Sequence, residues 1–332
     1  MSHRLPDQWV WDFWLVDDGP RRHLFHLSAA RELAPADRHR HARVRHAVSE
    51  DLTQWEPLGE VVAPSPGPAF DDLAIWTGSI VRGDDQQWHL FYTGLSRQHA
   101  EAQQQIGHAV SSDLHVWARV STEPVVCPDP RWYRVFGDNA DDQPWRDPFV
   151  VRDPGRDGWH MLVTASAAGV ADDDSGVIGH AWSADLVDWE VREPLSSPGS
   201  GFNQLEVPQV IQIEGQWVLV ANCLGPDLSA QRRARGIPGG AWWVAAPSPI
   251  GPFDLAKATR LTDESLYAAK VTQAPDGAWV VLAFINSDED GAFVGELADP
   301  MPVSPPWLAG TRAGAAALPL SALRCEGSED RP

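Results

Sequence analysis

The sequence predicts an all-β protein, a five-bladed β-propeller that forms a single domain over residues 1–302. The first observation is a motif, H-A-x-S-x-D-L-x-x-W, that begins at His46, His108 and His180 and returns in degenerate form over 243–257. The distance between copies is long for a solenoid repeat and suits a four-stranded blade with its loops. The second observation is a set of short β-branched and aromatic runs broken by turn residues, which is typical of hairpins. The third is a content of 27 Gly and 28 Pro, which is normal for a turn-rich β protein.

The predicted hairpins occur once in each repeated unit. They cover residues 13–29, 79–94, 148–166, 208–223 and 270–286. A third strand follows each hairpin, and in four units the S-x-D-L-x-x-W turn or its remnant leads into a fourth strand. Five such units give five blades around a central axis. The fifth unit has no copy of the turn, and the Pro-, Ala- and Gly-rich residues 303–332 are expected to form a tail and no C-terminal β-sandwich.

The repeat also assigns a role to its own residues. His46, His108 and His180 have the ligand type of a metal site, but equivalent positions in successive blades lie far apart around a ring. We therefore expect a repeated structural role, such as a hydrogen bond between strands. The repeated tryptophans are expected to be packing residues; they are Trp55, Trp117 and Trp189.

The composition excludes several classes of function. With 26 Lys and Arg against 46 Asp and Glu, the formal net charge of -20 disfavours nucleic acids and anionic membranes as partners. The first 14 residues lack the apolar core of a secretory signal, so a cytoplasmic location is expected. Cys127, Cys223 and Cys325 are too far apart for a disulfide framework or a zinc site. No metal or cofactor is expected; calcium could bind one of the acidic runs, but solvated loops are the preferred interpretation. The sequence carries no signal for an oligomeric state.

Carboxylates stand on three of the predicted innermost strands. The first strand of each blade lines the central channel of a propeller, so polar side chains there share one cavity. At this position the chain has Asp12, Arg146 with Asp147, and Glu206, which only closure of the ring brings together. Two carboxyl groups across a sugar ring, one ionised and one protonated, are the arrangement of glycoside hydrolysis. Aromatic side chains that could stack on sugar faces accompany them; these are Trp11, Trp76 and Tyr267.

These segments resemble glycoside hydrolase families 32 and 68, the invertases, inulinases, levanases and levansucrases. WVWDFW around Asp12 is similar to the V-W-D-S-W of levansucrases, and IWTGSI is similar to their W-S-G-S, with Thr77 in place of the first Ser. WRDPFV matches the R-D-P motif, and HLFYTG is also typical. LEVPQV matches the E-C-P or E-R-P element, from which Val207 departs. The resemblance extends over about residues 9–302, although the S-x-D-L-x-x-W turns are shared with family 43.

The resemblance implies a role for each acid. Asp12 would be the nucleophile, Asp147 would hold sugar hydroxyls and stabilise the transition state, and Glu206 would be the general acid/base. The residues expected to bind the sugar substrate are Trp11, Trp76, Thr77, Arg146 and Tyr267. The expected function is retaining hydrolysis of β-fructofuranosides, sucrose or short fructo-oligosaccharides, with fructosyl transfer as a related outcome. Asp12 is then expected to be ionised, and the pKa of Glu206 to be raised toward neutrality.

Two other functions are compatible with the same residues. One is inverting hydrolysis of arabinofuranosides or xylosides in the manner of family 43, with Asp12 activating a water. The two mechanisms differ in carboxyl separation, which is about 5 Å for a retaining pair and roughly 6.5–9.5 Å for an inverting pair. The other is a non-catalytic propeller that binds sugar or protein. Acids on three inner strands make this last function the least favoured.

Overall fold

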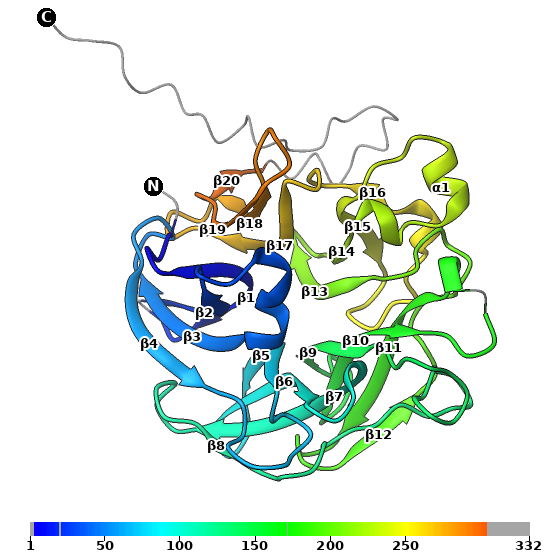
Figure 1. Ribbon diagram of the computed structural model, residues 1–332, viewed down its shortest axis with the longest axis horizontal. Helices are drawn as coiled ribbons and strands as arrows, with labels where there is room; N and C mark the ends of the chain where they lie inside the picture. The colour runs from blue at the N-terminus through cyan, green and yellow to red at the C-terminus, as the bar shows by residue number, and fades with distance from the viewer. Residues whose placement is uncertain (1–2, 20, 171, 304–332) are drawn as a thin grey trace, which may run out of the picture.

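The computed structural model describes residues 3–19, 21–170 and 172–303, and it confirms the five-bladed propeller. Within these residues, five four-stranded antiparallel sheets surround a central axis (Figure 1). Each innermost strand contacts the innermost strand of the next blade, and the fifth contacts the first, so the ring is closed. The expected tail lies outside the described residues except for Val303, and so does Cys325.

The blades follow one another along the chain. Blade 1 contains β1 (Gln8–Asp17), β2 (Arg22–Ala30), β3 (Arg43–Ser49) and β4 (Glu56–Val62). Blade 2 contains β5 (Ala74–Arg82), β6 (Trp88–Ser96), β7 (Ala100–Ser111) and β8 (Ala118–Arg119). Blade 3 contains β9 (Trp145–Arg152), β10 (Trp159–Ser166), β11 (Gly176–Ser183) and β12 (Trp189–Arg192). Blade 4 contains β13 (Glu206–Ile213), β14 (Gln216–Cys223), β15 (Gly240–Ala246) and β16 (Thr259–Arg260). Blade 5 contains β17 (Leu266–Gln273), β18 (Trp279–Ser287), β19 (Phe293–Leu297) and β20 (Met301–Pro302).

The described helices are short and lie in the loops. They are η1 (Pro35–His41), η2 (Asp172–Asp174), η3 (Gly225–Asp227), α1 (Ala230–Ala234) and η4 (Leu255–Lys257). Only η1 interrupts blade 1, because it stands between β2 and β3. None of the helices in the described ranges has the length and apolar character needed to cross a bilayer.

Blade 5 closes the ring with a segment from the other end of the domain. Its β20 pairs with β18 and not with β19. The free edge of β19 pairs instead with His3, through His3 N to Leu297 O at 3.0 Å and Leu297 N to His3 O at 3.1 Å. The place of an outer strand is therefore taken by the residues before β1. This explains why the fifth unit of the sequence carries no copy of the turn motif.

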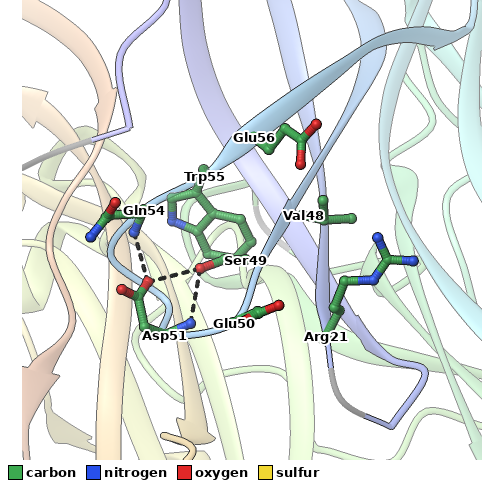
Figure 2. A pocket seen from close by; sticks show the side chains of 8 residues that line it. All are labelled: Arg21, Val48, Ser49, Glu50, Asp51, Gln54, Trp55 and Glu56. Carbon is green, nitrogen blue, oxygen red and sulfur yellow. Dashed lines mark hydrogen bonds between the residues drawn. The ribbon is translucent and has the colours of Figure 1, made fainter.

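The repeated motif forms a turn held by its own side chains, and Figure 2 shows the first copy. The hydroxyl of Ser49 accepts from the backbone N–H of Leu52 at 2.9 Å and donates to the Asp51 carboxylate at 3.0 Å. Asp51 accepts in turn from the backbone N–H of Gln54 at 2.8 Å. These contacts hold Leu52 at a φ of 64°, which an L-residue with a bulky side chain rarely adopts. The second and third copies repeat the same bonds.

The tryptophan of the motif packs between blades, as expected of a packing residue. Trp117 of blade 2 lies edge-on to Phe25 of blade 1, with ring centroids 6.0 Å apart. Trp189 of blade 3 lies in the same way against Phe91 of blade 2, at 5.3 Å. The larger hydrophobic clusters also join neighbouring blades, so the core of the protein lies between the sheets.

The expected hydrogen bond between strands is confirmed for the repeated histidines. His46 Nε2 lies 2.8 Å from Nδ1 of His23 on β2, and the pairs in blades 2 and 3 are equivalent. In each pair the second-strand histidine also contacts an aspartate of the first hairpin turn, which for His23 is Asp18 at 2.9 Å. Burial lowers the pKa of His46 to about 3, so this ring is neutral and structural.

Candidate active site

Every innermost strand carries a β-bulge at the same level of the channel. On β1 the pairing with β2 passes from Trp11 to Phe13 and leaves Asp12 as the extra residue. The corresponding residues of the other blades are Thr77, then Asp147 and Pro148, Val207 and Pro208, and Ala268 and Ala269. A bulge redirects side chains that regular alternation would send elsewhere, and it is common beside active sites. Asp12 and Asp147 are bulge residues, and Glu206 directly precedes one.

Bulge residues of three strands, Asp12, Asp147 and Val207, line one cavity of about 360 Å³, which lies within the size range of small-ligand sites. All three acids line it, so closure of the ring brings Asp12, Asp147 and Glu206 together. Of the predicted sugar-binding residues, four line the same cavity; they are Trp11, Trp76, Arg146 and Tyr267. A larger hollow of about 540 Å³ lies apart, beside the turn in Figure 2, and contains none of these residues.

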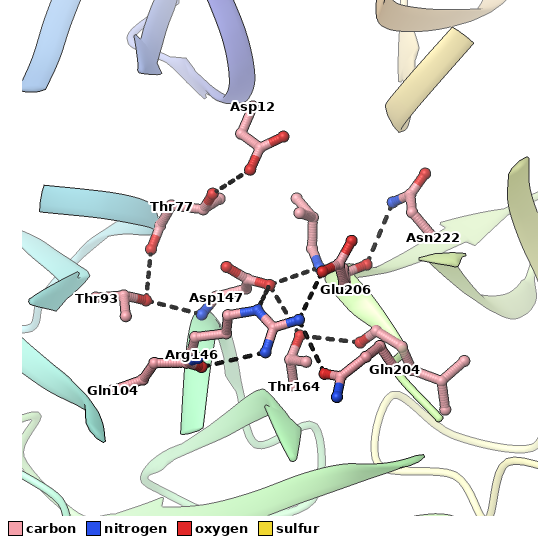
Figure 3. A network of polar contacts seen from close by, with 12 residues as sticks. Asp12, Thr77, Thr93, Gln104, Arg146, Asp147, Thr164, Gln204, Glu206 and Asn222 are labelled. Atoms are coloured by element: carbon pink, nitrogen blue, oxygen red, sulfur yellow. Dashed lines mark hydrogen bonds and ion pairs between the residues drawn. The ribbon is translucent and has the colours of Figure 1, made fainter. Parts of the chain in front are cut away.

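Asp12 stands in the part of the cavity next to blade 2. Its Oδ2 accepts a hydrogen bond from the Thr77 hydroxyl at 2.9 Å (Figure 3). Thr77 is buried and is not among the residues that line the cavity, and that it binds sugar stays a prediction. Its hydroxyl donates to Asp12 and so orients the carboxyl.

The surroundings of Asp12 act on its ionisation. Loss of water around the carboxyl raises its pKa to about 7, and the charges of Asp147 and Glu206 act in the same direction. The Thr77 hydroxyl and the Arg38 guanidinium favour the carboxylate and limit the shift. The carboxyl is crowded by like charges in a buried pocket, which favours its protonated form. That Asp12 is ionised stays a prediction.

Asp147 is buried and held from three sides. Its Oδ2 accepts from the backbone N–H of Val207 at 3.0 Å and from the Thr164 hydroxyl at 2.9 Å. The guanidinium of Arg146 lies 3.5 Å from the same oxygen. Burial raises the pKa of Asp147, while Arg146 opposes the rise. The backbone of Asp147 has a φ of 55°, a conformation seen mostly where the surrounding structure enforces it.

Glu206 is held by two side chains of the predicted site. Arg146 donates from its Nη2 to Oε1 at 2.6 Å, and the Tyr267 hydroxyl donates to Oε2. Arg146 is itself fixed by the side-chain oxygens of Gln104 at 3.1 Å and Gln204 at 2.9 Å (Figure 3). Both carboxylates beside Arg146 raise its pKa, so the guanidinium stays charged. It therefore links Asp147 and Glu206 and offsets part of their mutual repulsion.

Polar residues on two of the second strands connect a bulge to the next blade. Thr93 on β6 donates its hydroxyl to the carbonyl of Thr77 at 3.1 Å and accepts from the backbone N–H of Asp147 at 2.9 Å. Asn222 on β14 donates to the carbonyl of Glu206 at 3.3 Å and accepts from the backbone N–H of Ala269 at 3.0 Å. Figure 3 shows the contacts of Thr93 with Thr77 and Asp147 and the contact of Asn222 with Glu206. The three acids are thus set by one continuous polar network.

The predicted aromatic residues occupy different depths of the site. Trp11 is only 1% exposed, so it forms part of the cavity wall and offers little surface to a ligand. Trp76 is half-buried and donates its indole N–H to the carbonyl of His39 at 2.7 Å. Tyr267 is buried, and its hydroxyl is bound to Glu206. Of the three, Trp76 presents the most ring surface to the cavity.

Several cavity residues were not predicted from the sequence; they are Arg38, His39, Glu101, Gln104, Gln204, Asp227, Phe284 and Asn286. Arg38 and His39 come from η1, which the sequence shows only as a basic run inside a loop. The Arg38 guanidinium lies 4.0 Å from the centre of the Phe293 ring, and burial lowers its pKa to about 10. Gln204 had a signal, because it lies two residues before Glu206 and an extended chain places such residues on one side.

The described part of the chain contains no group of three or more His, Cys, Asp and Glu side chains placed to hold a metal ion. Cys127 and Cys223 are both free thiols. The absence of a cofactor and of structural calcium stays a prediction.

Comparisons with known proteins agree with the fold. Residues 23–294 match the model of the glycosyl hydrolases family 32 N-terminal domain. The extracellular sucrase of Zymomonas mobilis is 24% identical over 339 residues, which cover 89% of this chain and 78% of that protein. An insoluble β-fructofuranosidase isoenzyme of Arabidopsis thaliana is 31% identical over 124 residues, 36% of this chain and 19% of that relative. A levanase of a Bacillus species is 31% identical over 131 residues, again 36% of this chain and only 13% of the relative.

Solved structures share the fold at low identity. The inulosucrase from Halalkalicoccus jeotgali, bound to kestose, superposes with a TM-score of 0.72 at 21% identity, over 89% of this chain and 80% of that chain. The levansucrase from Gluconacetobacter diazotrophicus gives 0.67 at 20% identity, over 95% of this chain and 80% of that chain. Because the family model spans most of the propeller, including the strands that carry Asp147 and Glu206, the chain belongs to glycosyl hydrolase family 32.

Proposed function

We propose that the protein is a retaining glycoside hydrolase that acts on β-fructofuranosides, sucrose or short fructo-oligosaccharides. The observation that carries this proposal is the convergence of Asp12, Asp147 and Glu206 on one cavity of about 360 Å³. The family supports glycoside hydrolysis, and the sucrase, fructofuranosidase and levanase among the relatives support a fructosyl substrate. The cavity suits a small sugar, because carboxyl, guanidinium and aromatic side chains line it together.

The first half of the reaction makes a fructosyl-enzyme. A carboxylate oxygen of Asp12 attacks the anomeric carbon of the fructosyl unit while the bond from that carbon to the leaving oxygen breaks. Glu206 gives its proton to the leaving oxygen. This step requires Asp12 as the carboxylate and the transferred proton on Glu206. The Thr77 hydroxyl and Arg38 favour that distribution, because both stabilise the ionised form of Asp12.

The second half releases the sugar. Glu206 takes a proton from a water molecule, whose oxygen attacks the anomeric carbon and displaces the Asp12 carboxylate. A sugar hydroxyl in place of that water gives fructosyl transfer by the same steps. Asp147 and Arg146 would bind hydroxyls of the fructosyl ring, and their fixed positions favour bonds that tighten in the transition state.

Product stereochemistry tests this mechanism. We expect sucrose and kestose to release fructose first as the β-furanose, the anomer of the substrate, because two displacements at one carbon restore its configuration. Proton NMR during early turnover, with an aryl arabinofuranoside as a parallel substrate, measures this. First release of the α-anomer, or preferred cleavage of the arabinofuranoside, would show the family-43-like inverting reaction. An absence of turnover on all three would favour the non-catalytic propeller.

The pH dependence of kcat/KM should change when the charge of Arg38 is removed. In the folded protein its positive charge favours the carboxylate form of Asp12, so removing the charge raises the pKa of Asp12 further. We expect Arg38→Gln to move the acid limb of the profile to higher pH, because the nucleophile then needs a higher pH to ionise. Arg43→Gln is the control, since Arg43 is exposed on β3 and pairs with Glu60. An acid limb that stays in place in Arg38→Gln would contradict this assignment.

The cytoplasmic location and the lack of nucleic-acid or membrane partners stay predictions. The supporting observation for the last two is the net charge of -20, which opposes binding to polyanions.

A further inference from the structure

The protein has only two lysines, and one of them lies on the propeller axis. Lys257 is on the outer surface, with its side chain 80% exposed, and it pairs with Asp254. Lys270 is on β17 and is 6% exposed. It lines a second hollow of about 180 Å³, formed by residues from all five innermost strands. An ammonium group so far from water needs partners on the protein.

Its partners are two carbonyl oxygens of the bulge on β13. The Nζ of Lys270 donates to the carbonyl of Val207 at 2.9 Å and to that of Pro208 at 3.2 Å. Val207 has a φ of 49°, and a left-handed conformation is strained for a β-branched residue. Pro208 cannot stabilise the bulge through a backbone N–H, because it has none. The conformation therefore depends on contacts from outside the strand, and Lys270 supplies two of them.

The same bulge sets both acids of blades 3 and 4. The N–H of Val207 donates to Oδ2 of Asp147 at 3.0 Å, while its carbonyl accepts from Lys270. Glu206 directly precedes Val207 and pairs with Asn222 where the register shifts. A movement of the Val207 peptide would thus displace Asp147 through the hydrogen bond from Val207. It would displace Glu206 through the chain, because the two residues are adjacent. Val207 also lines the active-site cavity, whereas Lys270 lines the hollow beyond it.

Lys270 also brings a positive charge near Asp147 and Asp12. Asp147 on β9 and Asp12 on β1 both favour its charged form, while burial lowers its pKa to about 7. The other charged groups around the second hollow are Asp17 on β1 and Arg22 on β2, and these pair with each other. The side chains that β5, β9 and β13 bring to this hollow are uncharged. By reciprocity, a charged Lys270 favours the carboxylate forms of Asp12 and Asp147.

We propose that Lys270 is a positioning residue of the active site, which holds the Val207–Pro208 bulge and through it the carboxyls of Glu206 and Asp147. This inference rests on the proposed function, and no contact of Lys270 with the sugar is involved. The positions of the acids would then depend on a side chain that lines the second hollow and not the active-site cavity.

The first test compares Lys270→Met with Lys257→Met. Methionine keeps the length of the side chain and removes the charge and the donors. We expect kcat on sucrose to fall by about 100-fold in Lys270→Met, with a much smaller change in KM, because misplaced catalytic groups cost rate more than ground-state binding. The acid limb of the pH profile should rise by about 1 unit, since the acids lose a nearby cation. Lys257→Met should match the wild type, and a folded Lys270→Met with wild-type kcat and profile would overturn the proposal.

The second test needs no turnover, so it separates this inference from the proposed function. Lysine labelled with ¹³C at Cε gives two NMR signals in the wild-type chain, and Lys257→Met assigns them. We expect the Lys270 signal to titrate at lower pH than that of Lys257, and at still lower pH in Asp147→Asn, which removes a charge that favours the ammonium. A Lys270 titration that Asp147→Asn leaves unchanged would refute the coupling, even if Lys270→Met fails to fold. If the wild type cleaves no fructoside, the proposed function fails while this measurement still decides the placement of Lys270.

Discussion

Replacing Asp12 by asparagine is expected to lower kcat on sucrose by about 10⁴-fold or more, the scale of loss when a catalytic nucleophile is removed. Asparagine has the same shape and can still accept the hydrogen bond from Thr77. It cannot form the fructosyl-enzyme, because an amide oxygen is a poor nucleophile and carries no charge to meet the developing positive charge on the sugar. Initial rates at saturating substrate measure the effect.

The same variant should fold at least as well as the wild type. The pKa of Asp12 is about 7 in the folded protein against an ordinary value of 3.8, so its ionisation opposes folding as the pH rises between these values. An uncharged residue at this position removes that cost, and we expect Tm at neutral pH to be unchanged or higher. The control is Asp17→Asn on the same strand, since Asp17 is 57% exposed and pairs with Arg22. Full activity in Asp12→Asn would exclude Asp12 as the nucleophile.

Replacing Glu206 by glutamine should lower activity on sucrose by about 10²- to 10⁴-fold, the usual contribution of a general acid. The loss should depend on the leaving group. An aryl fructoside with an acidic phenol departs without protonation, so the first step on that substrate should be almost normal and a burst of phenol should precede slow release of fructose. Stopped-flow absorbance measures the burst, and steady-state rates on sucrose give the comparison.

The control for this variant is Glu214→Gln, at the exposed turn that follows β13. It changes the same residue type on the same hairpin but away from the cavity, and its kinetics should match the wild type. If Glu206→Gln lost the same factor on sucrose and on the aryl fructoside, the missing proton could not be the cause. Glu206 would then have to act through its contacts with Arg146 and Tyr267.

The blades could be predicted because the repeated residues perform local tasks that leave a pattern. Ser49 and Asp51 close a turn within a few residues, and His46 meets a partner on the adjacent strand. Such contacts recur wherever the unit recurs. The three acids could be predicted for a related reason, since charged residues on strands that otherwise bury apolar side chains require a cavity.

The rest of the site could not be predicted because it depends on contacts between units. The bulges have no local signature, and a left-handed Val207 is a conformation that its residue type opposes. The raised pKa of Asp12 depends on burial in the assembled ring and on two acids from other blades. Arg38 reaches the cavity from η1, whose position is set by the fold around it. The outer strand position of blade 5, taken by His3, follows from ring closure and not from the fifth unit itself.

The backbone pair between His3 and Leu297 joins residues almost 300 positions apart, so blade 5 is completed only when both segments are present. The cavity wall on that side comes from β17 and β18, which carry Tyr267, Phe284 and Asn286. These strands are translated after the other four blades. We expect a nascent chain with four finished blades to show no turnover, and activity to begin only once blade 5 has been translated.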